Sequence, residues 1–186
     1  MMMRGAKLWL VSLLLITLTA CTAPSAQPTQ SVELTRQFES SAFLFDYPET
    51  WQYQIPQANL LFLASPDVLA QRPGATLTIQ RTISFASSAN LEDALNTYLA
   101  RGPLRADRHW QAVTEVESLV FDTYDAVSIL VEGSEQADSL PMRSRVYLLQ
   151  AESGFFFIMT ATAPVTQWDT VQPTFDAIFA SMDLLE

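Results

Sequence analysis

Hydrophobic and polar residues alternate with a period of two along much of the chain after residue 42, which is the pattern of β-strands. Phe43, Phe45 and Tyr47, for example, share one face of a first strand. Further strands are predicted at residues 51–55, 60–64, 75–80, 110–117, 119–132, 141–150 and 155–163. Short connections between neighbouring strands, such as residues 151–154, predict antiparallel pairing.

Two stretches follow a helical period instead. Asn90 and Asp93 form a capping pair, and an apolar stripe with spacings of three and four runs from Leu91 to Leu99 before Gly102 ends the helix. A second stripe is formed near the C-terminus by Trp168, Val171, Phe175, Ile178 and Met182.

The second helix contains a proline, Pro173. With Thr170 as the N-cap, Pro173 would fall in the first turn, where its missing N–H loses no bond within the helix. Strands and helices together predict an α+β fold, a mostly antiparallel sheet of six or seven strands with two main helices packed on it.

The N-terminal segment has the order of a bacterial lipoprotein signal peptide. Arg4 and Lys7 supply positive charge, and residues 8–18 form an apolar run that is too short to span a bilayer. Leu18-Thr19-Ala20-Cys21 then resembles a lipobox. We expect residues 1–20 to be removed and Cys21 to carry the lipid that holds the protein at the membrane.

A lipidated Cys21 and a flexible tether are predicted for residues 21–37. Residues 22–37 contain two prolines and many small or polar residues without apolar periodicity. At full extension such a stretch reaches about 50 Å. The globular domain is then expected at residues 38–186.

The residue after Cys21 indicates in which membrane the lipoprotein is retained. It is Thr22, and not the aspartate that typically retains lipoproteins in the inner membrane. We therefore expect a cell-envelope location, at the outer membrane in a bacterium with two membranes and otherwise on the outer face of the plasma membrane.

Composition excludes several classes of function. The formal net charge is −10, opposite to the basic surface that nucleic-acid binding requires. Lys7 is the only lysine, so the expected mature chain has none for a Schiff base or a phosphate-binding loop. Cys21 is the only cysteine and His109 the only histidine. We expect no metal, no cofactor and no nucleic-acid partner, and a hydrolase is the least favoured alternative.

One candidate binding patch is expected where the strands at 119–132, 141–150 and 155–163 pair. A symmetric loop at 133–140 would place Arg145 opposite Ser128, and a four-residue turn at 151–154 would place Arg145 opposite Thr160. The predicted patch for an anion or a partner comprises Arg143, Arg145, Ser128, Thr160 and Thr162. The alternative is ordinary cross-strand pairing of both arginines with nearby acids.

Two short motifs resemble the PsbP-like family, which includes extrinsic photosystem II proteins, bacterial lipoproteins and Mog-type Ran-binding proteins. Phe45-Asp46-Tyr47-Pro48-x-x-Trp51 is similar to the strand-turn-strand opening of that family, and Phe179-Ala180-Ser181-Met182 is similar to its closing helix. The resemblance covers residues 38–185 and implies a sandwich with helices on both faces of the sheet. It also implies a binding protein, an adaptor or an assembly factor, without enzymatic activity.

These observations favour a non-catalytic, membrane-anchored lipoprotein that binds or helps to assemble a protein partner. The alternative is a carrier of a small apolar acid, with Arg143 or Arg145 at the mouth of a cavity. The two functions differ in whether the face beside Tyr147 and Phe156 is an open cavity or is filled by side chains.

Overall fold

The computed structural model describes residues 32–105, 109–121, 123–134, 136 and 139–185. The strands are β1 (Arg36–Glu39), β2 (Phe43–Tyr47), β3 (Gln52–Gln57), β4 (Leu60–Ala64), β5 (Thr76–Thr82), β6 (Gln111–Ala112), β7 (Glu117–Phe121), β8 (Tyr124–Gly133), β9 (Met142–Gln150), β10 (Phe156–Pro164) and β11 (Asp183–Leu184). The helices are α1 (Pro66–Leu69), α2 (Leu91–Arg101) and α3 (Trp168–Ala180), and a 3₁₀ turn, η2 (Val165–Gln167), precedes α3. No helix in these ranges is long and apolar enough to cross a membrane.

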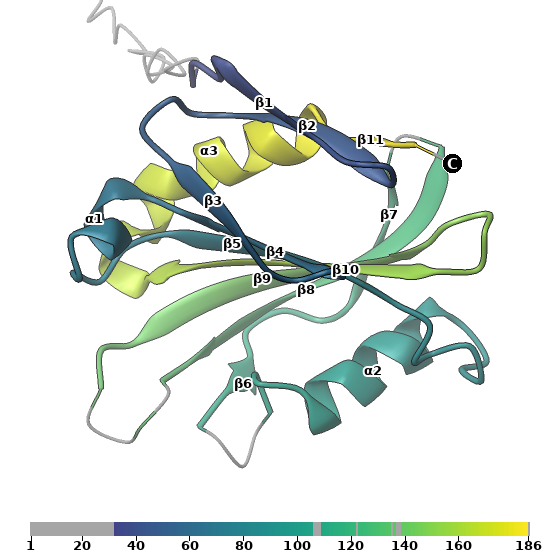
Figure 1. Ribbon diagram of the computed structural model, residues 1–186. Helices are drawn as coiled ribbons and strands as arrows, with labels where there is room; N and C mark the ends of the chain where they lie inside the picture. Colours follow the sequence, from purple (N-terminus) through teal and green to yellow (C-terminus); the bar gives the residue numbers. More distant parts are fainter. Residues whose placement is uncertain (1–31, 106–108, 122, 135, 137–138, 186) are drawn as a thin grey trace, which may run out of the picture. The chain divides into compact units, whose positions relative to one another are not determined.

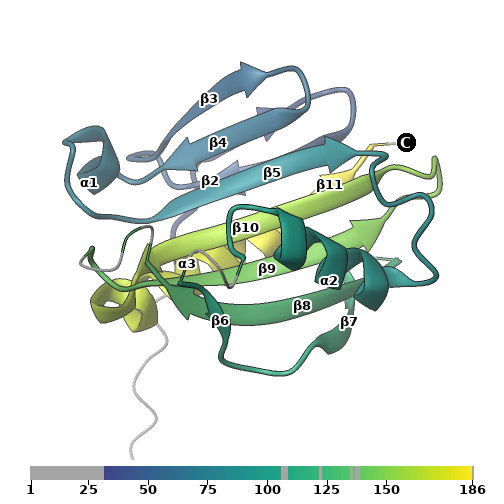
Figure 2. The ribbon, with the colours of Figure 1, turned by 90° about the horizontal axis from the view of Figure 1, so that it is seen from below.

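The strands form two antiparallel sheets (Figures 1 and 2). The main sheet has eight strands in the order β3-β4-β5-β10-β9-β8-β6, with β7 also paired to β8. The small sheet has the order β1-β2-β11. The predicted α+β fold is therefore confirmed, although the main sheet has more than six or seven strands and the small sheet was not foreseen. The chain passes from one sheet to the other in the turn after β2, where Trp51 N–H donates to Pro48 O at 3.0 Å.

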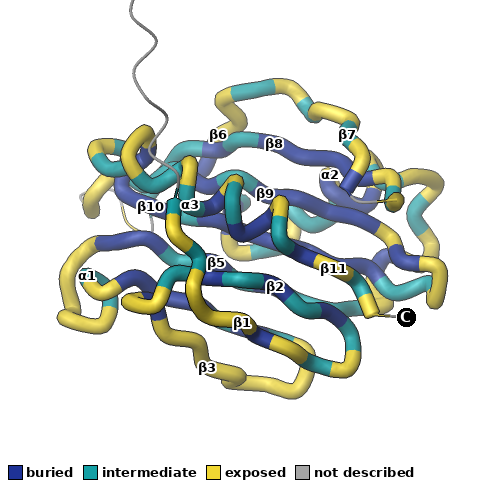
Figure 3. The backbone as a smooth tube through the Cα atoms, turned by 90° about the horizontal axis from the view of Figure 1, so that it is seen from above, coloured by how far each residue is buried: buried dark blue, intermediate teal, exposed yellow. Residues whose placement is uncertain are grey.

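The main sheet is covered on both faces (Figure 1). Helix α2 lies on one face, over β8 and β9. Helix α3 and the small sheet lie on the other face. Each face has its own apolar core, and β10 is buried along nearly its whole length (Figure 3). The predicted arrangement, with the two main helices packed on the sheet, is thus the one that the structure has.

Helix α2 begins and ends where the sequence predicts. Asn90 Oδ1 accepts a hydrogen bond from Asp93 N–H at 2.8 Å, which satisfies a donor of the first turn. Ala94 and Leu95 are fully buried against the sheet. Gly102 follows the last turn, and its N–H donates to Tyr98 O at 2.6 Å.

Helix α3 begins earlier than predicted. Its N-cap is Gln167, not Thr170, so Pro173 lies inside the helix instead of in its first turn. Trp168 accounts for the early start because it is buried at the first helical position and its indole N–H donates to Gln172 Oε1 at 3.0 Å. Pro173 is exposed, on the side of the helix away from the core.

Strand β3 corrects a second expectation. In the strand predicted at 51–55, alternation places Trp51, Tyr53 and Ile55 on one face, but β3 begins only at Gln52 and all six of its residues are exposed. It is an edge strand, paired on one side to β4. Trp51 is buried because the preceding turn directs its ring onto Phe175, with ring centroids 5.8 Å apart.

The pairing of β9 with β10 is shifted by one residue from the prediction. Gly154 has φ +83° and its N–H donates to Ala151 O, while Ala151 N–H donates to Phe155 O. The loop therefore has three residues, with glycine in the left-handed conformation, and Arg145 lies opposite Ala161 instead of Thr160. A one-residue shift moves every side chain of one strand to the other face relative to its partner.

The pairing of β8 with β9 is shifted by two residues. Arg143 lies opposite Glu132, and Arg145 lies opposite Leu130 instead of Ser128. A shift of two keeps the predicted face but changes each neighbour. Ser128 lies opposite Tyr147 instead.

Replacing Trp51 or Trp168 by alanine should lower the free energy of unfolding by about 3–5 kcal/mol, because each change empties a buried aromatic site. Trp168 is 2% exposed and Trp51 is 5% exposed. Urea denaturation followed by circular dichroism measures the loss. The control is Val120→Ala, at a side chain that is 68% exposed, with a change expected within about 0.5 kcal/mol. A loss below about 1 kcal/mol for either tryptophan would contradict its place in the core.

Candidate functional site

Arg143, the first residue of the predicted patch, forms ion pairs within the protein. Its Nε donates to Glu132 Oε1 at 2.6 Å, and its Nη2 contacts the same oxygen. Asp169 Oδ1 lies 3.9 Å from Nη1. The guanidinium carbon also lies 5.9 Å from the ring centroid of Trp168. Arg143 therefore follows the alternative prediction, in which the arginine pairs with an acid on the neighbouring strand.

Arg145 and Ser128 lie beside Tyr147 on the face that α3 covers. Burial raises the pKa of Tyr147, and Arg145 partly offsets this effect as a hydrogen-bond partner and as a positive charge, while Asp176 and Glu117 raise the pKa further. Ser128 is buried. Arg145 thus lies among polar and charged groups of the protein itself.

Thr160 and Thr162 lie on the opposite face of the main sheet, which corrects the predicted single patch. The hydroxyls of Thr160 and Tyr98 are 3.5 Å apart, and those of Thr162 and Ser144 are 2.6 Å apart. The cause is the one-residue shift between β9 and β10. Binding by any of the five residues stays a prediction, but they do not form one surface.

The binding protein and the carrier were expected to differ in whether the face beside Tyr147 and Phe156 is an open cavity or is filled by side chains. The two residues lie on different faces, and both are packed: the Tyr147 ring lies 4.4 Å from that of Phe179, and the Phe156 ring lies 5.7 Å from that of Phe85. A shallow groove of about 340 Å³ lies beyond Tyr147, between β7 and α3. It is lined by Asp176 and Asp183 and has no arginine, so it does not suit an acid.

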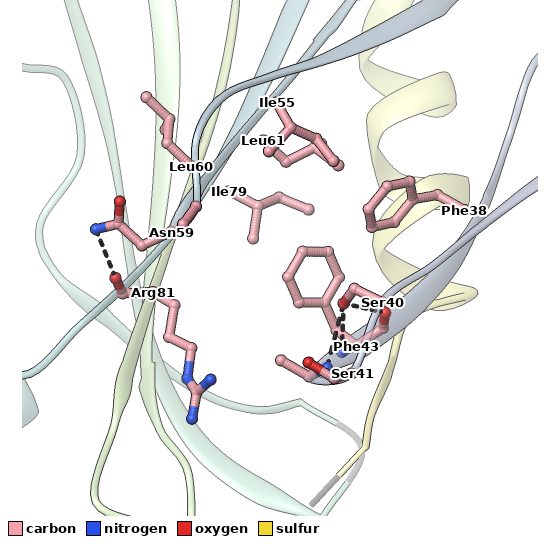
Figure 4. A pocket seen from close by; sticks show the side chains of 12 residues that line it. Phe38, Ser40, Ser41, Phe43, Ile55, Asn59, Leu60, Leu61, Ile79 and Arg81 are labelled. Carbon is pink, nitrogen blue, oxygen red and sulfur yellow. Dashed lines mark hydrogen bonds between the residues drawn. The ribbon is translucent and has the colours of Figure 1, made fainter.

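A different pocket combines apolar walls with a cation (Figure 4). It lies between the β1–β2 turn of the small sheet and the β3–β4 turn of the main sheet, and we call it the hairpin pocket. Its volume is about 110 Å³. It is lined by Phe38, Ser40, Ser41, Ala42, Phe43, Ile55, Ala58, Asn59, Leu60, Leu61, Ile79 and Arg81.

The walls of the hairpin pocket come from both sheets. Phe38 and Phe43 of the small sheet are buried and their rings lie 5.6 Å apart. Leu61 and Ile79 of the main sheet are buried opposite each other on β4 and β5. Ile55, which is 55% exposed, lies at the outer side. The pocket is therefore an opening in the core that reaches the surface.

Arg81 is the cation of the hairpin pocket. It follows Leu77 and Ile79 on the inward face of β5, where an apolar residue would continue the pattern. Its guanidinium carbon lies 3.6 Å from the ring centroid of Phe155. Its Nε is shielded from solvent and has no hydrogen-bond partner, and Arg81 forms no ion pair with any acid in the described ranges.

The backbone of Arg81 is held firmly at the rim. Its N–H donates to Asn59 O at 2.9 Å, and Asn59 Nδ2 donates to Arg81 O at 3.2 Å. Ser40 secures the opposite rim, since its hydroxyl donates to Phe43 O at 2.9 Å and accepts from the N–H groups of Ala42 and Phe43. The two turns thus hold the pocket open on either side of a cation.

The chemistry of this arrangement is binding. An arginine guanidinium offers donors in a fixed fork that matches a carboxylate, and apolar walls bind an apolar group beside it. Sequence reasoning missed Arg81 because the predicted strand ended at residue 80. The signal was present, since Ala75, Leu77 and Ile79 alternate and Arg81 is the next position of the same face.

Arg143→Met should lower the free energy of unfolding by about 1 kcal/mol, and Glu132→Gln by a similar amount, because each leaves half of a partly buried ion pair without its partner. The Arg143 and Glu132 side chains are 24% and 29% exposed. Urea denaturation of both single variants and the double variant gives the coupling energy. We expect the double variant to lose clearly less than the sum, whereas additive losses would contradict a structural pair.

Comparisons with known proteins bear on the fold. No protein-family model matches the chain, and no curated protein matches it. Among solved structures, cyanobacterial PsbP (CyanoP) from Synechocystis sp. PCC 6803 aligns over 87% of this chain and 98% of its own, with a TM-score of 0.59 and 11% identity. The Ran-binding protein Mog1p of Saccharomyces cerevisiae aligns over 83% of this chain and 97% of its own, with a TM-score of 0.59 and 9% identity.

Two further structures are similar. LpqN, involved in cell envelope biogenesis of Mycobacterium tuberculosis, aligns over 76% of this chain and 82% of its own, with a TM-score of 0.55 and 11% identity. A Bacteroides thetaiotaomicron structure aligns over 83% of this chain with a TM-score of 0.54 and 13% identity, and this chain spans 50% of its length. At these identities the similarity concerns the fold, and the predicted resemblance is confirmed: the domain has the PsbP-like fold of CyanoP, Mog1p and LpqN.

Proposed function

We propose that the chain is a non-catalytic binding module of the cell envelope, anchored through a lipid on Cys21, that holds a partner protein at the hairpin pocket. The observation that carries this proposal is Arg81, a partly buried cation beside apolar walls with no acid partner in the described ranges. Two proteins of the same fold support the proposal, one for binding and the other for the cell envelope. Mog1p is a Ran-binding protein, and LpqN is involved in cell envelope biogenesis.

The size of the hairpin pocket favours a partner protein over a free acid. Its volume of about 110 Å³ is well below the range of roughly 300–1,000 Å³ that holds drug-sized ligands. A short acid that fills it gains roughly 3–4 kcal/mol from burial, at about 0.8 kcal/mol for each methylene. That free energy corresponds to a Kd of roughly 1–6 mM.

A partner protein can add contacts outside the pocket. Tyr53 and Ile55 of the edge strand β3 are 42% and 55% exposed, and Ile55 borders the pocket. Apolar side chains around a central pocket are typical of protein interfaces. The alternative carrier of a small apolar acid would use the same pocket, with Arg81 in the role first given to Arg143 or Arg145.

Cys21→Ser should release the protein from membranes and leave the domain folded, because Cys21 is the expected site of the lipid. Cell fractionation with immunodetection measures this, and circular dichroism checks the fold. In a bacterium with two membranes, we expect the parent protein in the outer-membrane fraction. A Cys21→Ser protein that still pellets with membranes would overturn the anchor.

Arg81→Gln should reduce capture of the partner about tenfold, because a hydrogen-bonded charge is lost from a partly buried site. The measurement is quantitative affinity purification of the full-length protein from its native membranes. Arg101→Gln is the matched control, since Arg101 is exposed at the end of α2, and it should leave the yield unchanged. Equal yields from the parent and Arg81→Gln would contradict a role for the hairpin pocket.

A further inference from the structure

The hairpin pocket specifies the chemistry of its occupant. Building on the proposed function, we infer that the partner enters with a free C-terminus whose last side chain is apolar, and that Arg81 binds the terminal carboxylate. The apolar walls, the unpartnered donor and the short distance between them each limit the occupant in a different way (Figure 4).

The walls limit the size and polarity of the group that enters. Phe38, Phe43, Leu61 and Ile79 are buried and apolar, and the pocket has a volume of about 110 Å³. A cavity of about 150 Å³ lined by Leu, Ile and Phe side chains binds benzene. One side chain of the size of leucine or isoleucine therefore fills the hairpin pocket, and a long acyl chain does not fit.

Arg81 determines the charge of the occupant. Its guanidinium lies over the Phe155 ring, so the ring contacts one face and the N–H groups at the edge are left for an acceptor. The shielded Nε has no hydrogen-bond partner in the described part of the chain. A carboxylate provides two oxygens in the geometry of the guanidinium fork and would satisfy this donor.

The distance between the apolar wall and the cation favours a chain terminus. Ile79 and Arg81 are two positions apart on one strand face, roughly 7 Å along the strand. The carboxylate must therefore be close to the apolar side chain. In an extended peptide, an adjacent Asp or Glu would point to the opposite face, whereas an acid two positions away would share the face but would have further rotamers to fix on binding. A terminal α-carboxylate is attached to the same Cα as the last side chain.

The chain's own segments are weaker candidates for the pocket. Residues 22–31 of the expected tether contain no acid. The residue after β11 does reach this corner, since Leu185 N–H donates to Ala42 O at 2.9 Å. Glu186 follows Leu185 and lies outside the described residues, so the experiment includes a variant of it.

The test uses N-acetyl-leucine, which has one apolar side chain and a free α-carboxylate. It is titrated into the full-length protein in phospholipid nanodiscs, and ¹⁵N–¹H NMR follows the Arg81 Nε–H signal and the amides of Phe43 and Ile79. We expect saturable shifts of these signals, with a Kd on the order of 1 mM. N-acetyl-leucinamide, without the charge, and N-acetylglycine, without the side chain, should each bind about tenfold more weakly.

Variants assign the binding to Arg81. Arg81→Gln and Arg81→Met should each abolish the saturable shifts of Phe43 and Ile79, and Arg101→Gln should leave them unchanged. The probe comparison in the parent protein tests the inference even if both Arg81 variants unfold. A peptide, Gly-Ser-Gly-Ser-Leu, should bind at least as tightly as N-acetyl-leucine.

Four results would overturn the inference. One is equal binding of the acid and the amide. Another is tighter binding of 4-methylpentanoate than of the peptide, which would indicate a free acid as the ligand. The third is a change of the Arg81 Nε–H signal in the Glu186→Gln variant to the signal of a donor without an acceptor, which would assign the site to the side-chain carboxylate of Glu186. The fourth is the absence of any saturable shift while partner capture still depends on Arg81, in which case the proposed function stands and the C-terminal ligand does not.

Discussion

The fold depends on one constraint, the need to remove both faces of the central strands from water. Strand β10 and the inner parts of β8 and β9 are buried on both sides, although antiparallel sheets often leave one face to solvent. Leu148 and Ile158 lie on one face and need one packing layer to shield them from water. Leu149 and Met159 lie on the other face and need a second layer. Helix α2 provides the first, and α3 with the small sheet provides the second (Figure 1). In this composition, with a single cysteine, packing of apolar side chains has to supply the stability.

The candidate site lies where this second cover ends. The small sheet packs Phe38 and Phe43 onto the main sheet, and its β1–β2 turn lies between these two residues in the chain. Beyond that turn, β5 continues to Arg81 on the same face that buries Leu77 and Ile79. An arginine can occupy such a place because its stem packs on apolar surface and its head reaches the edge. The pocket thus lies where the small sheet ends and no longer covers this face of the main sheet.

Local patterns allowed most of the fold to be predicted, and connections caused the errors. Alternation located most strands of the main sheet, and the Asn90 cap located α2, because each depends on residues close in sequence. The strand predicted at 119–132 was wrong as a single element, since β7 ends at Phe121 and β8 begins at Tyr124 and pairs back onto it. The pairing of β9 with β10 instead depends on whether the loop has three or four residues, and Gly154 in a left-handed conformation decides that. The resulting register places Thr160 and Thr162 on the opposite face of the sheet from Arg143 and Arg145. The hairpin pocket could not be foreseen for a related reason, since the small sheet that forms half of it is positioned only by tertiary packing.

Two arginines of the same sheet show why residue type alone does not identify a site. Arg143 lies opposite Glu132 and close to Asp169, so its charge is neutralised within the protein and its role is structural. Arg81 lies opposite Phe157 and over Phe155, so its neighbours contribute apolar surface and no charge. Arg81 is therefore a partly buried cation that forms no ion pair with any acid in the described ranges. An occupant with a negative charge gains from a positive charge that the protein has left without an acid, and at Arg81 such a charge borders an apolar pocket.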